Sequence, residues 1–309
     1  MTASTRPAAA PALVAAALAC LLAGASAYTK PDQLQLLENF KQAMLARPQH
    51  SHWAAALASW TCPTAPNNTV GSTCDPCGQQ VWGNWEHISC RGKRVAYDKY
   101  EIPGDGTVTN VHVTDYLIEG PIPLAELCPF TALREFDVDG GSLTGPIPTG
   151  FAQCFPGLWE LDLSYNSLTG TLPPEIAQVK TLEEFKVEHN QLTGTVPPEY
   201  GSLQLNWLRF ADNKFVGTIP KEYAALQPEL YQLTLDNNGL DGNPGFSGNL
   251  YPLSKFSMSN FNAANNPGLC GMVPVGLRWG HGFNYYGTRL GLPCAEELAG
   301  GWVDLSESL

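Results

Sequence analysis

Residues 158–173 read LWELDLSYNSLTGTLP, and residues 182–197 read LEEFKVEHNQLTGTVP. The second stretch repeats the first after 24 residues, with apolar residues, asparagine, glycine and proline at matching places. A copy at a fixed period of this length indicates a stack of similar units, each too small to bury its apolar face alone. The repeat therefore predicts a solenoid and not a single globular core.

Within each unit, alternating apolar and polar residues predict a short strand. Leu161 and Leu163 should face the core and stack on their equivalents one turn away, whereas Asp162 between them should face outward. The strands of successive units should then lie parallel to one another. Outward positions would line up in columns across the sheet.

An asparagine position marks the end of each predicted strand. A buried amide there can bond main-chain groups of its own turn and of the neighbouring turn, which a buried polar group requires. Steps of 23 to 28 residues separate the seven positions, and the last five keep asparagine. The seven positions are Tyr116, Gly141, Asn166, Asn190, Asn213, Asn238 and Asn266.

The pattern L-x-x-L-x-L-x-x-N-x-L, continued by L-T-G-x-(I/V/L)-P, resembles the plant-type leucine-rich repeat. The resemblance covers about Leu34 to Cys294. It implies an α/β solenoid, a right-handed superhelix with a parallel β-sheet on the concave face and disulfide-stapled N- and C-terminal caps. It also implies a secreted binding protein, as in receptor-kinase ectodomains and polygalacturonase-inhibitor proteins.

Four parts of the chain are expected. Residues 1–27 contain one arginine, an apolar run and an A-x-A site, which together predict a secretory signal peptide. An uncleaved signal anchor or a transit peptide is the alternative. An N-terminal cap over 28–106, repeats over 107–269 and a C-terminal cap and tail over 270–309 would follow. No later segment is apolar enough to predict a membrane span, so we expect a protein of the extracellular space or cell wall.

Eight cysteines follow the predicted leader, and this even number predicts disulfides formed in an oxidising compartment. The C-x-x-C spacing at 74–77 leaves a redox or zinc site as an alternative. Two of the eight, 26 residues apart, hold nearly matching places in adjacent units. They are expected to bond to each other, or else to be two separate buried thiols. The eight are Cys62, Cys74, Cys77, Cys90, Cys128, Cys154, Cys270 and Cys294, and the matching two are Cys128 and Cys154.

The resemblance extends to both caps. At the N-terminal end it implies an opening helix over about Gln33 to Leu45 and a Cys77–Cys90 bridge, which leaves Cys62 with Cys74. At the other end, N-P-x-L-C-G at 266–271 implies that Cys270 pairs with Cys294. The segment between these two is longer than such a cap usually has, so either it is an insertion or the pairing differs.

Three further features belong to the cap region. A second short helix is expected around Trp53 to Trp60, and the polar connection from Gly92 to Thr107 is a candidate hairpin. Asn67 begins an N-x-T sequence in a loop rich in proline and asparagine, which predicts a glycosylation site.

The outward columns of the sheet are the candidate binding surface. They are acidic in the second to fourth units and carry aromatic side chains, which are common anchors for a partner. Since the repeat pattern itself often has polar residues here, a merely solvated face is the alternative. The candidate residues are Glu135, Asp137, Trp159, Glu160, Asp162, Tyr165, Glu184, Lys186, Glu188, His189, Trp207, Arg209 and Tyr231.

Composition and motifs exclude several classes of function. A formal net charge of −12 argues against binding nucleic acid. The sequence has no G-x-S-x-G, H-E-x-x-H, P-loop or kinase motif, so we expect no enzyme, no cofactor and no bound metal. The leading hypothesis is recognition of a basic protein or peptide. An inhibitor of a wall-degrading hydrolase and a structural wall protein held by polysaccharide are the alternatives.

Overall fold

The computed structural model describes residues 31–46, 88–90, 107–113, 119–226, 230–279 and 282–295. They belong to two compact units, Met1–His112 and Val113–Leu309. Several predictions fall outside the described residues. These are the leader, the helix around Trp53 to Trp60, Asn67, Tyr116, and the cysteines Cys62, Cys74 and Cys77.

The first unit contains the predicted opening helix, α2 (Pro31–Leu45). Its buried side chains, Leu37, Phe40 and Met44, recur every three or four residues and so form one apolar stripe. The helix prediction is confirmed. No helix within the described ranges has both the length and the apolar character needed to cross a membrane.

The same unit contains an antiparallel strand pair. β1 (Ile88–Cys90) pairs with β2 (Val108–His112), with Ile88 opposite Val111 and Ser89 opposite Asn110. The connection predicted as a hairpin, Gly92 to Thr107, lies between these two strands, and all of it but Thr107 is outside the described residues.

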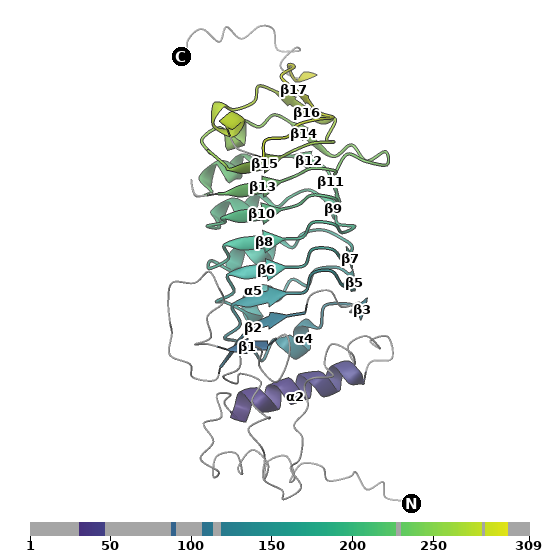
Figure 1. Cartoon of the computed structure of the whole chain (residues 1–309), viewed down its shortest axis with the longest axis vertical. Coiled ribbons are helices and arrows are strands. Elements are labelled where there is room, and N and C mark those ends of the chain that lie inside the picture. The colour runs from purple at the N-terminus through teal and green to yellow at the C-terminus, as the bar shows by residue number, and fades with distance from the viewer. Residues whose placement is uncertain are drawn as a thin grey trace, which may run out of the picture. The chain divides into compact units, whose positions relative to one another are not determined.

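In the second unit, one strand from each turn joins a parallel sheet in chain order (Figure 1). Equivalent residues of adjacent turns lie opposite each other, as Leu161 does to Phe185. The parallel order confirms the predicted solenoid. These strands open turns two to seven and are β4 (Glu135–Asp137), β6 (Glu160–Asp162), β8 (Glu184–Lys186), β10 (Trp207–Arg209), β13 (Gln232–Thr234) and β15 (Asn260–Asn262).

A second set of short strands follows the asparagine position in each turn. These strands also pair in parallel, in three small sheets. Their positions are β3 (Glu119–Gly120), β5 (Ser142–Gly145), β7 (Ser167–Leu168), β9 (Thr193–Gly194), β11 (Lys214–Phe215), β12 (Gly217–Thr218), β14 (Phe246–Gly248), β16 (Gly268–Gly271) and β17 (Arg289–Leu290).

Short helices complete the turns, and those of neighbouring turns contact one another. Proline at the first helical position suits such starts, because its missing N–H is not needed there. The helices are α4 (Leu124–Leu127), α5 (Phe151–Cys154), η2 (Pro174–Gln178), η3 (Pro198–Ser202), η4 (Lys221–Ala225), η5 (Tyr251–Leu253) and η6 (Val275–Trp279).

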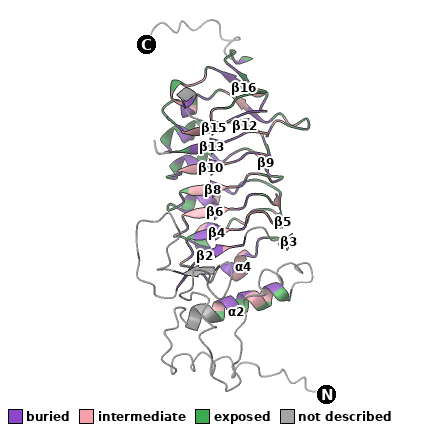
Figure 2. Ribbon diagram, viewed as in Figure 1, coloured by how far each residue is buried: buried purple, intermediate pink, exposed green. Residues whose placement is uncertain are grey.

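The core runs through the second unit between the sheet and the helices (Figure 2). In turn three, Leu161, Leu163, Leu168, Leu172 and Ile176 are all buried. Burying one such side chain stabilises the fold by about 1.5 to 3 kcal/mol relative to leaving it exposed. Because each turn covers the apolar face of its neighbour, the stability belongs to the stack and not to a single repeat.

The predicted asparagine ladder is confirmed. The side chain of Asn190 donates to the carbonyl oxygens of Leu163 in the previous turn and of Val187 and Glu188 in its own turn, at 2.9, 3.1 and 3.2 Å. Its Oδ1 accepts the Leu168 N–H at 2.9 Å. The same pattern recurs at Asn166, Asn213, Asn238 and Asn266.

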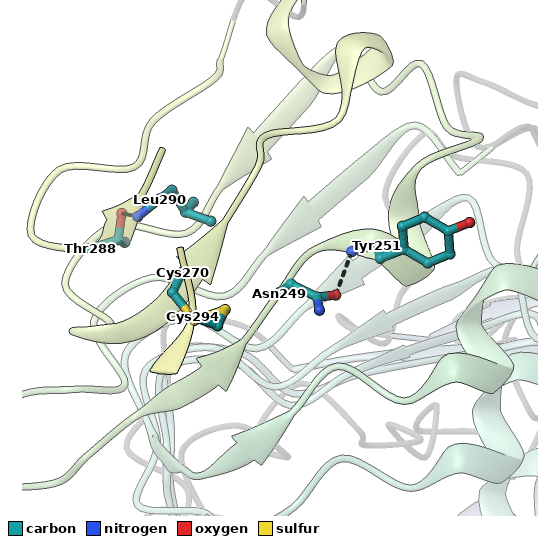
Figure 3. The surroundings of a disulfide bond; sticks show 6 residues. All are labelled: Asn249, Tyr251, Cys270, Thr288, Leu290 and Cys294. Carbon is teal, nitrogen blue, oxygen red and sulfur yellow. Dashed lines mark hydrogen bonds between the residues drawn. A yellow bond between two sulfur atoms is a disulfide. The ribbon is translucent and has the colours of Figure 1, made fainter. Parts of the chain in front are cut away.

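Two predicted disulfides are present. Cys128 follows α4 and Cys154 ends α5, and their bond joins the helices of turns one and two. Cys270 in β16 is bonded to Cys294 (Figure 3). Both pairings are those expected from the sequence.

The long segment between Cys270 and Cys294 forms an additional turn, which decides in favour of an insertion. Asn284 lies opposite Asn262 in parallel register, and β17 pairs with β16. This eighth turn was missed because it lacks the leucine and asparagine pattern. The sequence Gly-Leu-Pro at 291–293, which is one residue shorter than the G-x-x-P turn of the other units, was the available signal.

Candidate functional site

The predicted columns of outward residues exist. Strand pairing places one residue of each turn in a central column, and a second residue, two positions earlier, in a lateral column. The central column is Asp137, Asp162, Lys186, Arg209, Thr234 and Asn262. The lateral column is Glu135, Glu160, Glu184, Trp207, Gln232 and Asn260.

Not every outward position is open to solvent. Glu135 was expected on the solvent-facing surface but is only 6% exposed, and Ser164 is also buried. Adjacent strands are about 4.8 Å apart, so the long side chains of one turn cover their neighbours. The expected exposure of Glu135 is therefore wrong.

Carboxylates surround Lys186. Its Nζ lies 2.6 Å from Glu160 Oε1, 2.6 Å from Glu184 Oε2 and 3.6 Å from Asp162 Oδ2. These four residues are called the lysine cluster below, and all four side chains are largely buried. The sequence placed them in neighbouring columns, and the structure brings them into direct contact. Lys186 is thus held by the protein's own acids and is not a free cation for a partner.

The lysine cluster contains more carboxylates than ammonium groups. Two of these carboxyls, Glu160 and Asp162, therefore keep their protons to a higher pH than usual. Burial raises the pKa of Glu160 to about 7, with the charges of Glu184 and Glu135 adding to the effect against the favourable bond to Lys186. Burial also raises the pKa of Asp162. The bonds to Glu160 and Glu184 raise the pKa of Lys186 despite its desolvation, so its ammonium stays charged.

Stability should depend on pH through Glu160. Its folded pKa lies above the ordinary value of 4.5, so the folded state binds this proton more tightly than the unfolded state does. The resulting stabilisation is complete below pH 4.5 and is lost as pH rises through about 7. Relative to wild type, Glu160→Gln should gain stability between pH 5 and pH 8, by about 1 to 2 kcal/mol because the carboxyl keeps some solvent contact.

Denaturant unfolding of wild type and Glu160→Gln at four pH values measures this difference. Glu199→Gln on the exposed surface of η3 serves as the matched control for loss of one charge. A difference between wild type and Glu160→Gln that stays constant across the pH range would contradict the assignment.

The ring of Trp207 contacts both Lys186 and Arg209. The Lys186 Nζ lies 5.5 Å and the Arg209 Cζ 4.8 Å from its ring centroid, and the Tyr231 ring stacks on it at 6.0 Å. Arg209 also donates to Glu188 at 3.2 Å. Since Trp207 already has these intramolecular partners, Tyr231, at 54% exposed, is the open aromatic side chain here.

The residues directly before the ladder asparagines form a second outward row, called the rim column below. Each of its members has a left-handed backbone, with φ between 53° and 58°. The members are Tyr165, His189, Asp212, Asn237 and Asn265. Tyr165 stacks on His189 at 4.2 Å, and His189 Nε2 lies 3.4 Å from Asp212 Oδ2. Asn237 donates to Asp212 at 2.9 Å, and Asn265 donates to Asn237 at 2.6 Å. The sequence predicted Tyr165 and His189 as members of the surface but not Asn237 and Asn265. Their place directly before a ladder asparagine was the signal.

The other aromatic candidates do not gather in one place. Trp159 and Tyr231 hold the same position before their strands, but Glu183 and Asn206 of the intervening turns separate them. Tyr165 stands at the rim, 51% exposed. The surface therefore has separate aromatic contacts along its length instead of a single aromatic pocket.

Carboxylates dominate the described part of this surface. The two cations, Lys186 and Arg209, are each bonded to a carboxylate. Among the described residues, no group of three or more His, Cys, Asp or Glu is arranged to hold a metal ion. Asp236 shows the same crowding, because burial and the charges of Asp212 and Glu188 raise its pKa to about 6. The carboxylates are Glu135, Asp137, Asp139, Glu160, Asp162, Glu184, Glu188, Asp212 and Asp236.

Comparison with known proteins agrees with this architecture. The leucine-rich repeat family model matches residues 157–179. The HAESA receptor-kinase ectodomain of Arabidopsis, solved with an IDA peptide hormone ligand, is 22% identical with a TM-score of 0.57, covering 80% of this chain and 35% of that one. No curated protein sequence gave a significant match.

Two smaller structures resemble the chain over most of their length. The BIR2 ectodomain from Arabidopsis thaliana is 25% identical with a TM-score of 0.49, covering 70% of this chain and 95% of that one. A plant ice-binding protein is 19% identical with a TM-score of 0.45, covering 86% of this chain and 98% of that one. With the matched repeat, the parallel sheet and the asparagine ladder, the chain has the fold of a leucine-rich-repeat solenoid.

Proposed function

We propose that the protein is an extracellular, non-catalytic recognition module that binds a basic protein or peptide on turns two to four of its concave sheet. The observation that carries the proposal is the lysine cluster, in which three carboxylates surround a single ammonium group. The surface's own cations are thus neutralised, and the remaining negative charge is available to a partner. Complementary charge supplies specificity and speeds association.

An exposed aromatic side chain supports the same interpretation. Tyr165, 51% exposed, stands at the rim of turn three, whose strand carries Glu160 and Asp162 of the lysine cluster. Tyrosine gives a binding surface large contact area together with a polar group. The disulfides support an extracellular location, since such bonds persist in oxidising compartments.

Basic peptides test the proposal. Twelve-residue peptides rich in lysine and arginine should bind the oxidised protein, and their affinity should fall as salt is added. Glu160→Gln with Glu184→Gln removes two carboxylates and leaves Lys186 with Asp162 alone, so at pH 8, above the pKa of Glu160, affinity should fall about tenfold or more. Titration calorimetry at two salt concentrations measures both effects.

The control is a matched pair of changes on the opposite side of the turns. Glu199→Gln with Glu222→Gln also removes two charges, from η3 and η4, and should leave affinity nearly unchanged. Equal weakening by both pairs would show that only net charge matters, and binding that is insensitive to salt would exclude the acidic surface as the site.

A further inference from the structure

The central column changes its chemistry along the solenoid. It carries Asp137 and Asp162 in turns two and three, but Thr234 and Asn262 in turns six and seven. The eighth turn continues it with Asn284, opposite Asn262. The C-terminal part of the column therefore offers uncharged amide and hydroxyl groups where the N-terminal part offers carboxylates.

The orientation of these amides is fixed by the backbone. Asn262 Oδ1 accepts the Ala264 N–H, and Asn284 Oδ1 accepts the Tyr286 N–H, both at 3.2 Å. Because a main-chain N–H can only donate, the atom facing it must be the oxygen, and each amide nitrogen is directed away. Adjacent turns thus hold two amide donors in fixed positions, about 4.8 Å apart.

Thr234 extends this row of polar groups toward turn five. It faces the concave side, because Leu233 and Leu235 on either side of it are in the core. The residue is only 7% exposed, and its hydroxyl has no hydrogen-bond partner among the described residues. A polar group buried in this way is destabilising until it is hydrogen-bonded, so the site favours a ligand that supplies a partner.

Exposed tyrosines flank the row. Tyr286, 81% exposed, lies two residues after Asn284 on the same side, and Tyr231 precedes the strand of Thr234, whereas the ring of Tyr285 packs on Phe283. Their rings can pack on apolar C–H groups while their hydroxyls stay in water. Around them, Gln232, Asn237, Asn260 and Asn265 are uncharged, and Asp236 supplies a carboxylate acceptor at the edge.

The groups of this site suit a neutral pyranose sugar. Its hydroxyls accept from amide nitrogens and donate to a carboxylate, and its ring face packs on tyrosine.

We propose that turns six to eight of the concave sheet form a binding site for a neutral oligosaccharide. The amides of Asn262 and Asn284 and the Thr234 hydroxyl bond the sugar hydroxyls, and the flanking tyrosines contact the ring faces. This site is separate from the acidic surface of turns two to four. It would let one molecule hold a neutral glycan and a basic partner together.

The test uses the complete oxidised protein and neutral hexasaccharides of β-linked glucose, xylose, mannose and galactose. At least one should bind in a calorimetric titration, with an affinity that does not change with salt. Asn262→Asp with Asn284→Asp keeps the turn, because Asp162 already accepts the Ser164 N–H in the same way at 3.0 Å. Its loss of two donors should weaken binding about tenfold.

The control is the reverse exchange, Asp162→Asn, which should leave glycan affinity unchanged. Failure of all four hexasaccharides to bind at millimolar concentration would overturn the proposal, as would equal affinity in the double aspartate variant or salt-sensitive binding. Titration of the same variants with the basic peptides separates the two proposals, because the aspartate variant should keep its peptide affinity.

Discussion

Replacing Asn190 by leucine is expected to lower the free energy of unfolding by about 3 kcal/mol, since it strands a buried N–H and several carbonyl groups. The side-chain amide of Asn190 donates to the Leu163 carbonyl oxygen and accepts from the Leu168 N–H, both in the previous turn. Loss of these bonds affects two turns at once and should weaken the cooperativity of the stack. Denaturant unfolding followed by circular dichroism measures the effect.

The control is the next residue. Gln191 is exposed, so Gln191→Leu makes a similar chemical change without removing a buried polar group. It should alter the free energy of unfolding by less than about 0.5 kcal/mol. If the two variants have the same unfolding midpoint, the ladder does not stabilise the fold as described.

Removing the Cys128–Cys154 bridge should destabilise the protein by about 3 kcal/mol. The two residues are 26 positions apart, and the stabilisation expected for closing a loop of that length in the unfolded chain is about this size. Cys128→Ala with Cys154→Ala should therefore lower the thermal midpoint measurably. Differential scanning calorimetry of the two proteins checks the result.

The second bridge offers a matched comparison. Cys270 and Cys294 are 24 residues apart, so the chain-entropy effect is nearly the same. Their bond encloses the last turn, however, and that turn can open without unfolding the rest of the stack. Cys270→Ala with Cys294→Ala should mainly increase hydrogen exchange over 282–292. Equal loss of global stability in both double variants would contradict this difference.

Much of the fold follows from the period alone. The positions of Leu161 and Asn190 each repeat one turn on, so the strands, the columns and the ladder could be predicted from the sequence. The eighth turn could not, because Gly287 stands near the asparagine position and tyrosines replace the usual polar residues before it.

The candidate surface was predictable as columns but not as contacts. Register places Lys186 between the acidic residues of the preceding turn and of its own strand, yet the rotamers decide that it bonds Glu160 and Glu184. Trp207 shows the same limit. Its outward direction follows from the alternation, whereas its coverage by Arg209 and Tyr231 depends on how long side chains of adjacent turns fold over one another.

The left-handed backbone of the rim column restricts which side chains that edge can carry. Asparagine, aspartate and histidine tolerate this conformation better than β-branched residues do. His189→Val or Asn237→Ile would introduce backbone strain. A combinatorial library for new ligands should therefore vary the central and lateral columns freely, and draw the rim from a small set of residues. The molecule thus separates a face open to redesign from an edge that limits it.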